Sequence, residues 1–233
     1  MNTPFLRIRE SLAHLLFPRL CEGCQQPLLY QEDVLCLGCA LSLPRSGFHN
    51  VPLNEAALRL AGRMPFESAT AFGIFTVEGL LQHLLHRLKY KGRRSIGHYL
   101  GQQAGWDLRN ASWVAGLSGI VPVPLHPAKE RLRGYNQAGV LAEGLSEVLR
   151  IPVCDKLLRR TRHTSSQTLK SREERVRNVG TAFALEQPPP AGSHLLLIDD
   201  VLTTGATLES AARPLLLQPD VRISILAFAL AQS

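Results

Sequence analysis

The sequence predicts an α/β protein with a mostly parallel sheet, helices on both faces of that sheet, and a small cysteine module before it. Three observations support this prediction. From residue 69 onwards, short apolar runs alternate with helical patterns, as in parallel sheets. The run Leu195–Ile198 is apolar at every position, which is typical of a strand buried on both faces. Four of the five cysteines fall between residues 21 and 39.

Length and charge set broad limits. A chain of 233 residues is long enough for one α/β domain and a small module. The net charge of +7 favours anionic partners, either phosphates or nucleic acid. No uncharged apolar run approaches the length of a membrane span, and charged residues interrupt the first twenty positions. We therefore expect a cytoplasmic protein without membrane insertion.

Three segments are expected along the chain. Residues 1–45 hold an amphipathic helix and the cysteine module, residues 46–68 form a connection, and residues 69–233 form the main domain. The helix is predicted from apolar residues at helical spacing, namely Phe5, Ile8, Leu12, Leu15 and Leu16.

The cysteine module has two CxxC pairs separated by eleven residues: Cys21, Cys24, Cys36 and Cys39. Two such pairs complete a closed tetrahedral Zn²⁺ site, which would be structural because no ligand position stays open. Two disulfides or an iron–sulfur cluster are the alternatives. The fifth cysteine, Cys154, lies in an apolar context and is expected to be a buried filler.

The main domain is predicted to alternate strands and helices. Strands are expected at 69–76, 118–123, 195–198 and 221–229. Helices are expected at 77–90 and 96–108, from the phrase RGYNQ at 133–137 through 149, and at 207–217. The second strand-to-helix crossover is cationic, with Lys129, Arg131 and Arg133, the last of which begins the phrase RGYNQ at 133–137. The basic segment 159–178 has two open interpretations, a solvated surface or a mobile lid over phosphates.

The stretch LLLIDDVLTTGATLE, residues 195–209, carries the strongest functional signal. A buried strand ends in Asp199 and Asp200, and a polar turn then leads into a helix. Free N–H groups at a helix N-terminus suit a phosphate, and a carboxylate pair suits sugar hydroxyls or Mg²⁺. The pattern therefore predicts a phosphorylated sugar as ligand. The predicted turn residues are Thr203, Thr204, Gly205, Ala206 and Thr207.

These residues resemble the phosphoribosyl-pyrophosphate (PRPP) motif of type I phosphoribosyltransferases. With the CxxC pairs, LKYKG at 88–92, VPVP and RGYNQ, nearly the whole chain resembles the ComF (ComFC- or GntX-like) family. The resemblance implies a phosphoribosyltransferase-like fold, PRPP with Mg²⁺ as ligand, and a role in natural competence or the use of external DNA. It assigns ribose recognition and any catalysis to Asp199 and Asp200, and the 5′-phosphate to the turn at 203–207.

The resemblance also makes Lys129, Arg131 and Arg133 candidates for holding pyrophosphate. Whether the protein is a catalyst, and which nitrogen nucleophile would accept the ribose, stay open at this stage. The alternative hypothesis is a non-catalytic factor that binds single-stranded DNA or a competence helicase and uses PRPP as a regulatory ligand.

Overall fold

The computed structural model describes residues 18–161 and 182–232, and a four-stranded parallel sheet runs through this part of the chain. The strand order is β1 (Ala69–Phe75), β6 (Arg222–Ala231), β5 (His194–Leu202), β2 (Gly119–Pro122). The strand that carries the acid pair, β5, is therefore flanked on both sides. All three neighbour pairs are parallel, as predicted.

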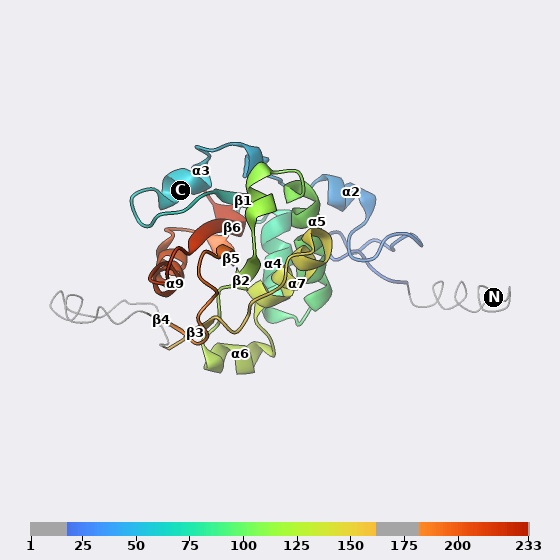
Figure 1. Ribbon diagram of the computed structural model, residues 1–233. Coiled ribbons are helices and arrows are strands. Elements are labelled where there is room, and N and C mark those ends of the chain that lie inside the picture. The colour runs from blue at the N-terminus through green and yellow to red at the C-terminus, as the bar shows by residue number, and fades with distance from the viewer. Residues whose placement is uncertain (1–17, 162–181, 233) are drawn as a thin grey trace, which may run out of the picture.

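Alternate residues of β5 face opposite layers. Leu196 and Ile198 lie in one apolar cluster, while Leu195 and Leu197 lie in another, and all four are buried. The first cluster includes residues of α4 (Leu80–Tyr90), α5 (Arg94–Leu108) and α7 (Gln137–Leu149); the second includes residues of α3 (Glu55–Leu60) and α9 (Ala206–Leu216). Figure 1 shows these two sets of helices on opposite sides of the sheet. The predicted fold class is confirmed.

The long helices lie where the apolar patterns predicted them, with shifts at their first residues. The predicted helix at 77–90 begins only at Leu80, because Glu78 has a φ of 60° and Gly79 is the extended N-cap. The helix predicted at 207–217 runs from Ala206 to Leu216 and contains Pro214 two residues before its end. Neither shift moves the buried faces of the helices.

Several short elements were not predicted. These are α2 (Leu37–Leu41), η1 (Phe48–Asn50), α3, η2 (Ser112–Gly116), α6 (Pro127–Arg133) and the antiparallel pair β3 (Leu158–Arg160) and β4 (Phe183–Leu185). The helix α3 lies inside the segment expected to be a connection. Its N-cap Asn54 accepts a hydrogen bond from the Ala57 N–H, and Leu60 is fully buried in the second cluster.

Two predictions concern residues outside the ranges 18–161 and 182–232 that the structure describes. The amphipathic helix predicted from Phe5 to Leu16 lies outside the described residues, as does the basic segment beyond Thr161 up to Asn178. Among the residues that the structure describes, no helix combines the length and apolar character needed to span a membrane.

Candidate functional site

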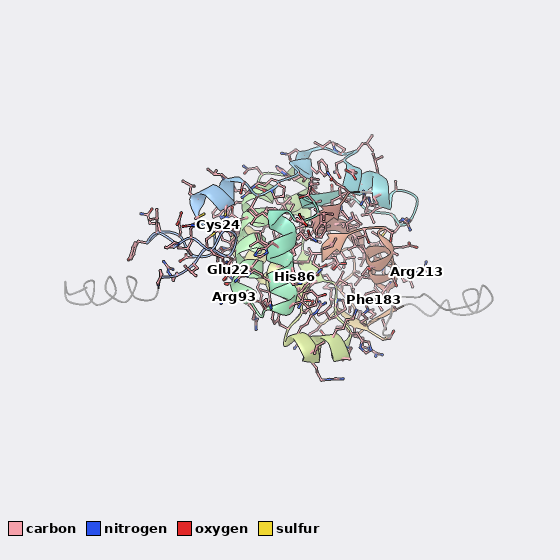
Figure 2. The ribbon with its side chains drawn as sticks, turned by 180° about the vertical axis from the view of Figure 1, so that it is seen from behind. Glu22, Cys24, His86, Arg93, Phe183 and Arg213 are labelled. Carbon is pink, nitrogen blue, oxygen red and sulfur yellow. The ribbon has the colours of Figure 1, made fainter. Side chains whose placement is uncertain are left out.

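The four cysteines of the two CxxC pairs lie together at one end of the molecule, and Cys24 marks this end in Figure 2. Their sulfur atoms all lie within 4.8 Å of one another, and the Sγ atoms of Cys24 and Cys36 are 3.6 Å apart. A tetrahedral site with Zn–S bonds of about 2.3 Å places its sulfurs about 3.8 Å apart. No cysteine in the described residues forms a disulfide. The geometry therefore fits a four-thiolate Zn²⁺ site.

Backbone donors around Cys21 favour a thiolate. The N–H groups of Gly23 and Cys36 donate to its sulfur at 3.4 and 3.2 Å. Burial of Cys21 acts to raise its pKa, but the N–H donors, including that of Cys24, outweigh burial and lower this pKa to about 6. Gly23 is required here, because a Cβ at this position would come within 2.9 Å of the Cys39 sulfur.

The acid pair lies at the carboxyl end of β5, and its two members have different surroundings. Asp200 forms an ion pair with Lys89 of α4, with Nζ 2.9 Å from Oδ2. Asp199 accepts a hydrogen bond from the Asp200 N–H at 2.9 Å. Burial, and then the neighbouring Asp200 charge, raise the pKa of Asp199 to about 7, although Lys89 and Arg160 act in the opposite direction. At neutral pH the pair therefore carries less than two negative charges.

A pocket of about 210 Å³ brings this acid pair together with cationic side chains from other parts of the chain. Thr207, at the start of α9, also lines it. The cationic lining residues are Lys89, Lys129, Arg133 and Arg160. Four cations against two carboxylates give the pocket a positive balance, which suits a polyanionic ligand that also carries groups for carboxylates to bind.

Only two of the three predicted pyrophosphate cations line this pocket. The residues 127–133 form the helix α6, which begins at Pro127 behind the His126 N-cap. Lys129 and Arg133 are four residues apart and share one face of α6, whereas Arg131 lies on the other face and is exposed. The structure thus separates Arg131 from the pocket.

The predicted phosphate turn connects β5 to α9. Gly205 caps α9 with a φ of 82°, and a Cβ on it would lie 2.7 Å from Cδ2 of Leu60 in α3. The N-cap offers no side-chain hydrogen bond to the first N–H groups of the helix. Thr203, Thr204 and Ala206 are exposed on this turn and, unlike Thr207, are not part of the pocket lining. The Ala206 N–H makes a long hydrogen bond of 3.5 Å to Oγ1 of Thr204, and the positive end of the α9 dipole at this position suits an anion.

No sequence pattern pointed to Arg59 of α3, which hydrogen-bonds the backbone of the turn at 203–207. Its Nη1 donates to the carbonyl oxygen of Thr203 at 3.2 Å and to that of Ala231 at 2.5 Å. Its Nη2 pairs with Glu55 at 2.5 Å. Nothing in the sequence around Arg59 marks it as a site residue, because its partners lie in distant segments.

A larger cavity, about 1040 Å³, lies between residues 29–40 of the cysteine module and α5. It contains none of the predicted site residues. We place the candidate ligand site in the smaller pocket, because the acids, the α9 N-terminus and the cations meet there.

Comparisons with known proteins agree with these features. Residues 136–232 match the phosphoribosyl transferase domain. The chain is 31% identical over 215 residues to the DNA utilization protein YhgH of Escherichia coli, covering 87% of this chain and 92% of that protein. It is 33% identical over 203 residues to competence protein F of Haemophilus influenzae, covering 83% and 89%.

Two further matches cover a smaller share of this chain than the two relatives above. Competence protein ComFC of Bacillus subtilis is 37% identical over 143 residues, which are 61% of this chain and 56% of that protein. Among solved structures, an allosteric regulatory enzyme of purine biosynthesis matches 58% of this chain and 25% of its own, with a TM-score of 0.34 and 18% identity. That likeness is too weak to bear on the fold.

Proposed function

The chain belongs to the ComF family, with DNA utilization protein YhgH and competence protein F among its members, and on this premise we propose that its pocket binds PRPP with Mg²⁺. The observation that carries the proposal is the meeting of Asp199, Asp200 and Thr207 with Lys129 and Arg133 in one pocket. A ligand with a phosphate at one end, a diol in the middle and a pyrophosphate at the other end matches this arrangement.

Each part of the ligand has a proposed partner. The N–H groups and hydroxyls of residues 203–207 hold the 5′-phosphate at the N-terminus of α9. The carboxylates of Asp199 and Asp200 accept hydrogen bonds from the ribose hydroxyls. Lys129 and Arg133 hold the pyrophosphate, and Mg²⁺ entering with the ligand would neutralise part of its charge. We do not assign Arg131 to the pocket, since it faces away from it.

Such a site provides what a phosphoribosyl transfer needs from the protein. As the C1–oxygen bond to pyrophosphate breaks and the nitrogen nucleophile bonds to C1, positive charge develops on the ribose in the transition state and negative charge develops on the departing pyrophosphate. The acid pair lies where the first develops, and the cationic face of α6 lies where the second develops. The acceptor is a nitrogen nucleophile of unassigned identity.

For the cysteine cluster we propose a structural Zn²⁺ ion. Four thiolates in a closed set leave no position for water or substrate, so the ion would stabilise the local fold around the two CxxC pairs, within the N-terminal segment that we propose at residues 1–45. Thiolate ligands need a reducing compartment, and we propose that the protein acts in the cytoplasm. There it would serve the use of DNA taken up from outside, as the names of its relatives indicate.

One observation favours a second candidate function, the binding of single-stranded DNA. Tyr90 is 61% exposed at the end of α4, and the guanidinium of Arg133 lies 5.2 Å from its ring centroid. An exposed aromatic ring beside cations is a stacking platform for a base. It adjoins the pocket through Arg133, so the two ligands would compete at this residue.

The decisive experiment measures PRPP binding in the presence of Mg²⁺ by calorimetry and by thermal unfolding. A ligand at a hundredfold excess over its Kd stabilises the native state by about 2.7 kcal/mol. We expect the double substitution Asp199→Asn, Asp200→Asn to abolish this shift. The matched control is Asp220→Asn, an exposed aspartate before β6. A double variant that binds PRPP as well as the parent would contradict the proposal.

A further inference from the structure

We propose that Glu22, inside the first CxxC pair, is a positioning residue for the PRPP pocket and acts on it through the last turn of α4. This inference rests on the function proposed above for that pocket. It assigns to the cysteine module a second task besides its own folding, because the module then holds part of the ligand site in place.

The carboxylate of Glu22 is almost fully enclosed. Its side chain is 9% exposed, and its two oxygens pair with two different arginines. Nη2 of Arg87 lies 2.6 Å from Oε2, and Nε of Arg93 lies 3.0 Å from Oε1. Figure 2 shows Glu22, Cys24 and Arg93 gathered on one side of α4.

The backbone at Glu22 is fixed by the fold of the cysteine module. Its N–H donates to the Val34 carbonyl at 2.9 Å, and the N–H of the preceding Cys21 donates to that of Gln26 at 2.9 Å. Cys21 is also one of the four clustered thiols. The direction of the Glu22 side chain therefore depends on the order of this cluster.

The two arginines flank the end of the helix that supplies Lys89 to the pocket. Arg87 belongs to the last turn of α4 and Arg93 to the segment that follows it. Arg87 and Lys89 are two positions apart, which places them about 200° apart around the helix axis. One side of this turn thus contacts the cysteine module while the other side reaches Asp200 at 2.9 Å.

The same turn is held from a third direction. The hydroxyl of Tyr135, in the RGYNQ phrase, donates to the carbonyl oxygen of Leu88, whose side chain is fully buried. Glu22, Tyr135 and Asp200 therefore surround one helical turn. Loss of the Glu22 charge leaves Arg87, whose side chain is 19% exposed, without its carboxylate and frees this turn on the module side.

The experiment compares Glu22→Gln with the parent, both loaded with metal. The first readout is the Kd for PRPP with Mg²⁺, which we expect to rise about five- to tenfold, within the usual range of coupling between sites. The second is the rate at which acetic anhydride labels Lys89, followed by mass spectrometry with the exposed Lys156, which lies outside α4 and the pocket, as internal reference. Freed from its fixed pairing with Asp200, Lys89 should be labelled faster.

The matched control is Asp33→Asn. Asp33 is a carboxylate of the same module that pairs with Arg19 at 2.8 Å, but its side chain is 81% exposed and its partner does not belong to α4. We expect both readouts to stay at parental values. Metal content is measured for every variant, so that a change in the cluster itself is recognised.

Two outcomes overturn the proposal. The first is a rate of Lys89 labelling in Glu22→Gln equal to that of the parent. The second, where the parent binds PRPP, is a Kd for PRPP in Glu22→Gln equal to that of the parent. If the parent does not bind PRPP, the proposed function fails, while the labelling still decides the role of Glu22. If Glu22→Gln loses metal or does not fold, Arg93→Gln breaks one of the same ion pairs without altering the module. It must then speed the labelling of Lys89, and a parental rate overturns the proposal.

Discussion

Lys89 and Asp200 form an ion pair of 2.9 Å that joins the end of α4 to the end of β5. The pair makes the two adjacent aspartates chemically unequal, because Lys89 contacts Asp200 directly while Asp199 is left with a pKa raised to about 7. A pocket without ligand therefore contains a carboxyl group that burial and a neighbouring charge destabilise in its ionised form.

The raised pKa of Asp199 predicts a specific pH dependence of stability. The usual value is 3.8 and the native value about 7, so between these pH values the native state binds more protons than the unfolded state. The contribution of Asp199 to the free energy of unfolding is complete below about pH 4 and is lost as the pH rises to about 7. Asp199→Asn has no carboxyl group to ionise at this position, so its stability does not fall as the pH rises through this range. We therefore expect the substitution to raise the free energy of unfolding at pH 8 by about 1–3 kcal/mol.

Urea denaturation of the ligand-free protein at pH 5 and pH 8 measures this effect. The relevant quantity is the change between the two pH values, compared between Asp199→Asn and the parent, with Asp220→Asn as control. Equal changes in all three proteins would show that Asp199 ionises normally in the native state.

The cysteine cluster predicts about one Zn²⁺ per chain by elemental analysis of protein purified without added metal. We expect Cys21→Ser to lose the ion and to destabilise the module, because ion binding and local folding are coupled. Cys154→Ser is the matched control, since Cys154 lies outside the cluster and should leave the zinc content unchanged. Iron in place of zinc would overturn the assignment.

The lack of space for a Cβ between Gly205 and Leu60 predicts the cost of a single methyl group in the proposed phosphate turn. Gly205→Ala introduces a Cβ at a positive φ, which costs about 1–2 kcal/mol, and brings it to 2.7 Å from Cδ2 of Leu60. We expect a lower midpoint of thermal unfolding and weaker PRPP binding. Adding Leu60→Ala to this variant should recover the PRPP affinity lost through the clash with Leu60. It should not recover the affinity lost through backbone strain at the positive φ of residue 205. No loss of affinity in Gly205→Ala would show that the turn does not contact the ligand.

How far the sequence predicted this site depends on whether neighbours in space are neighbours in sequence. The acids and the turn at 203–207 share one strand–turn–helix unit, so a single pattern revealed them. Lys89 lies in the LKYKG phrase and Arg160 in the basic segment with two open interpretations, but their approach to the acid pair, like that of Arg59 to the turn, became visible only with the fold. The same holds for Glu22, whose role depends on α4.

Short helices account for most of the remaining differences. At α6 the sequence indicates a cationic crossover and no helix, because Pro122 and Pro124 before it favour an extended chain and seven residues show little periodicity. Its helical form decides which cations reach the pocket. Lys129 and Arg133 lie on one face and Arg131 lies on the other, a distinction that residue counting along an extended chain does not make.

The two faces of α6 therefore separate the proposed ligands. Lys129→Gln removes a cation from the pocket, and we expect PRPP binding to weaken by about 1.5–3 kcal/mol, or about ten- to hundredfold in Kd. Arg131→Gln removes the same charge from the exposed face and should leave PRPP binding near the parental value. Calorimetry of both variants with PRPP and Mg²⁺ measures the difference, and equal losses would contradict the placement of Arg131 outside the pocket.

Single-stranded DNA should respond in the opposite way if it runs along the exposed face of α6. Each phosphate that a cation neutralises contributes about −0.7 to the slope of log affinity against log salt. Arg131→Gln should then flatten the slope by about 0.7, while PRPP binding is retained. Because Arg133 lines the pocket and also stacks on Tyr90, PRPP should lower the affinity for DNA in the parent. DNA affinity that does not depend on salt, or no binding at low salt, would remove DNA as a ligand of this surface and leave the pocket to PRPP alone.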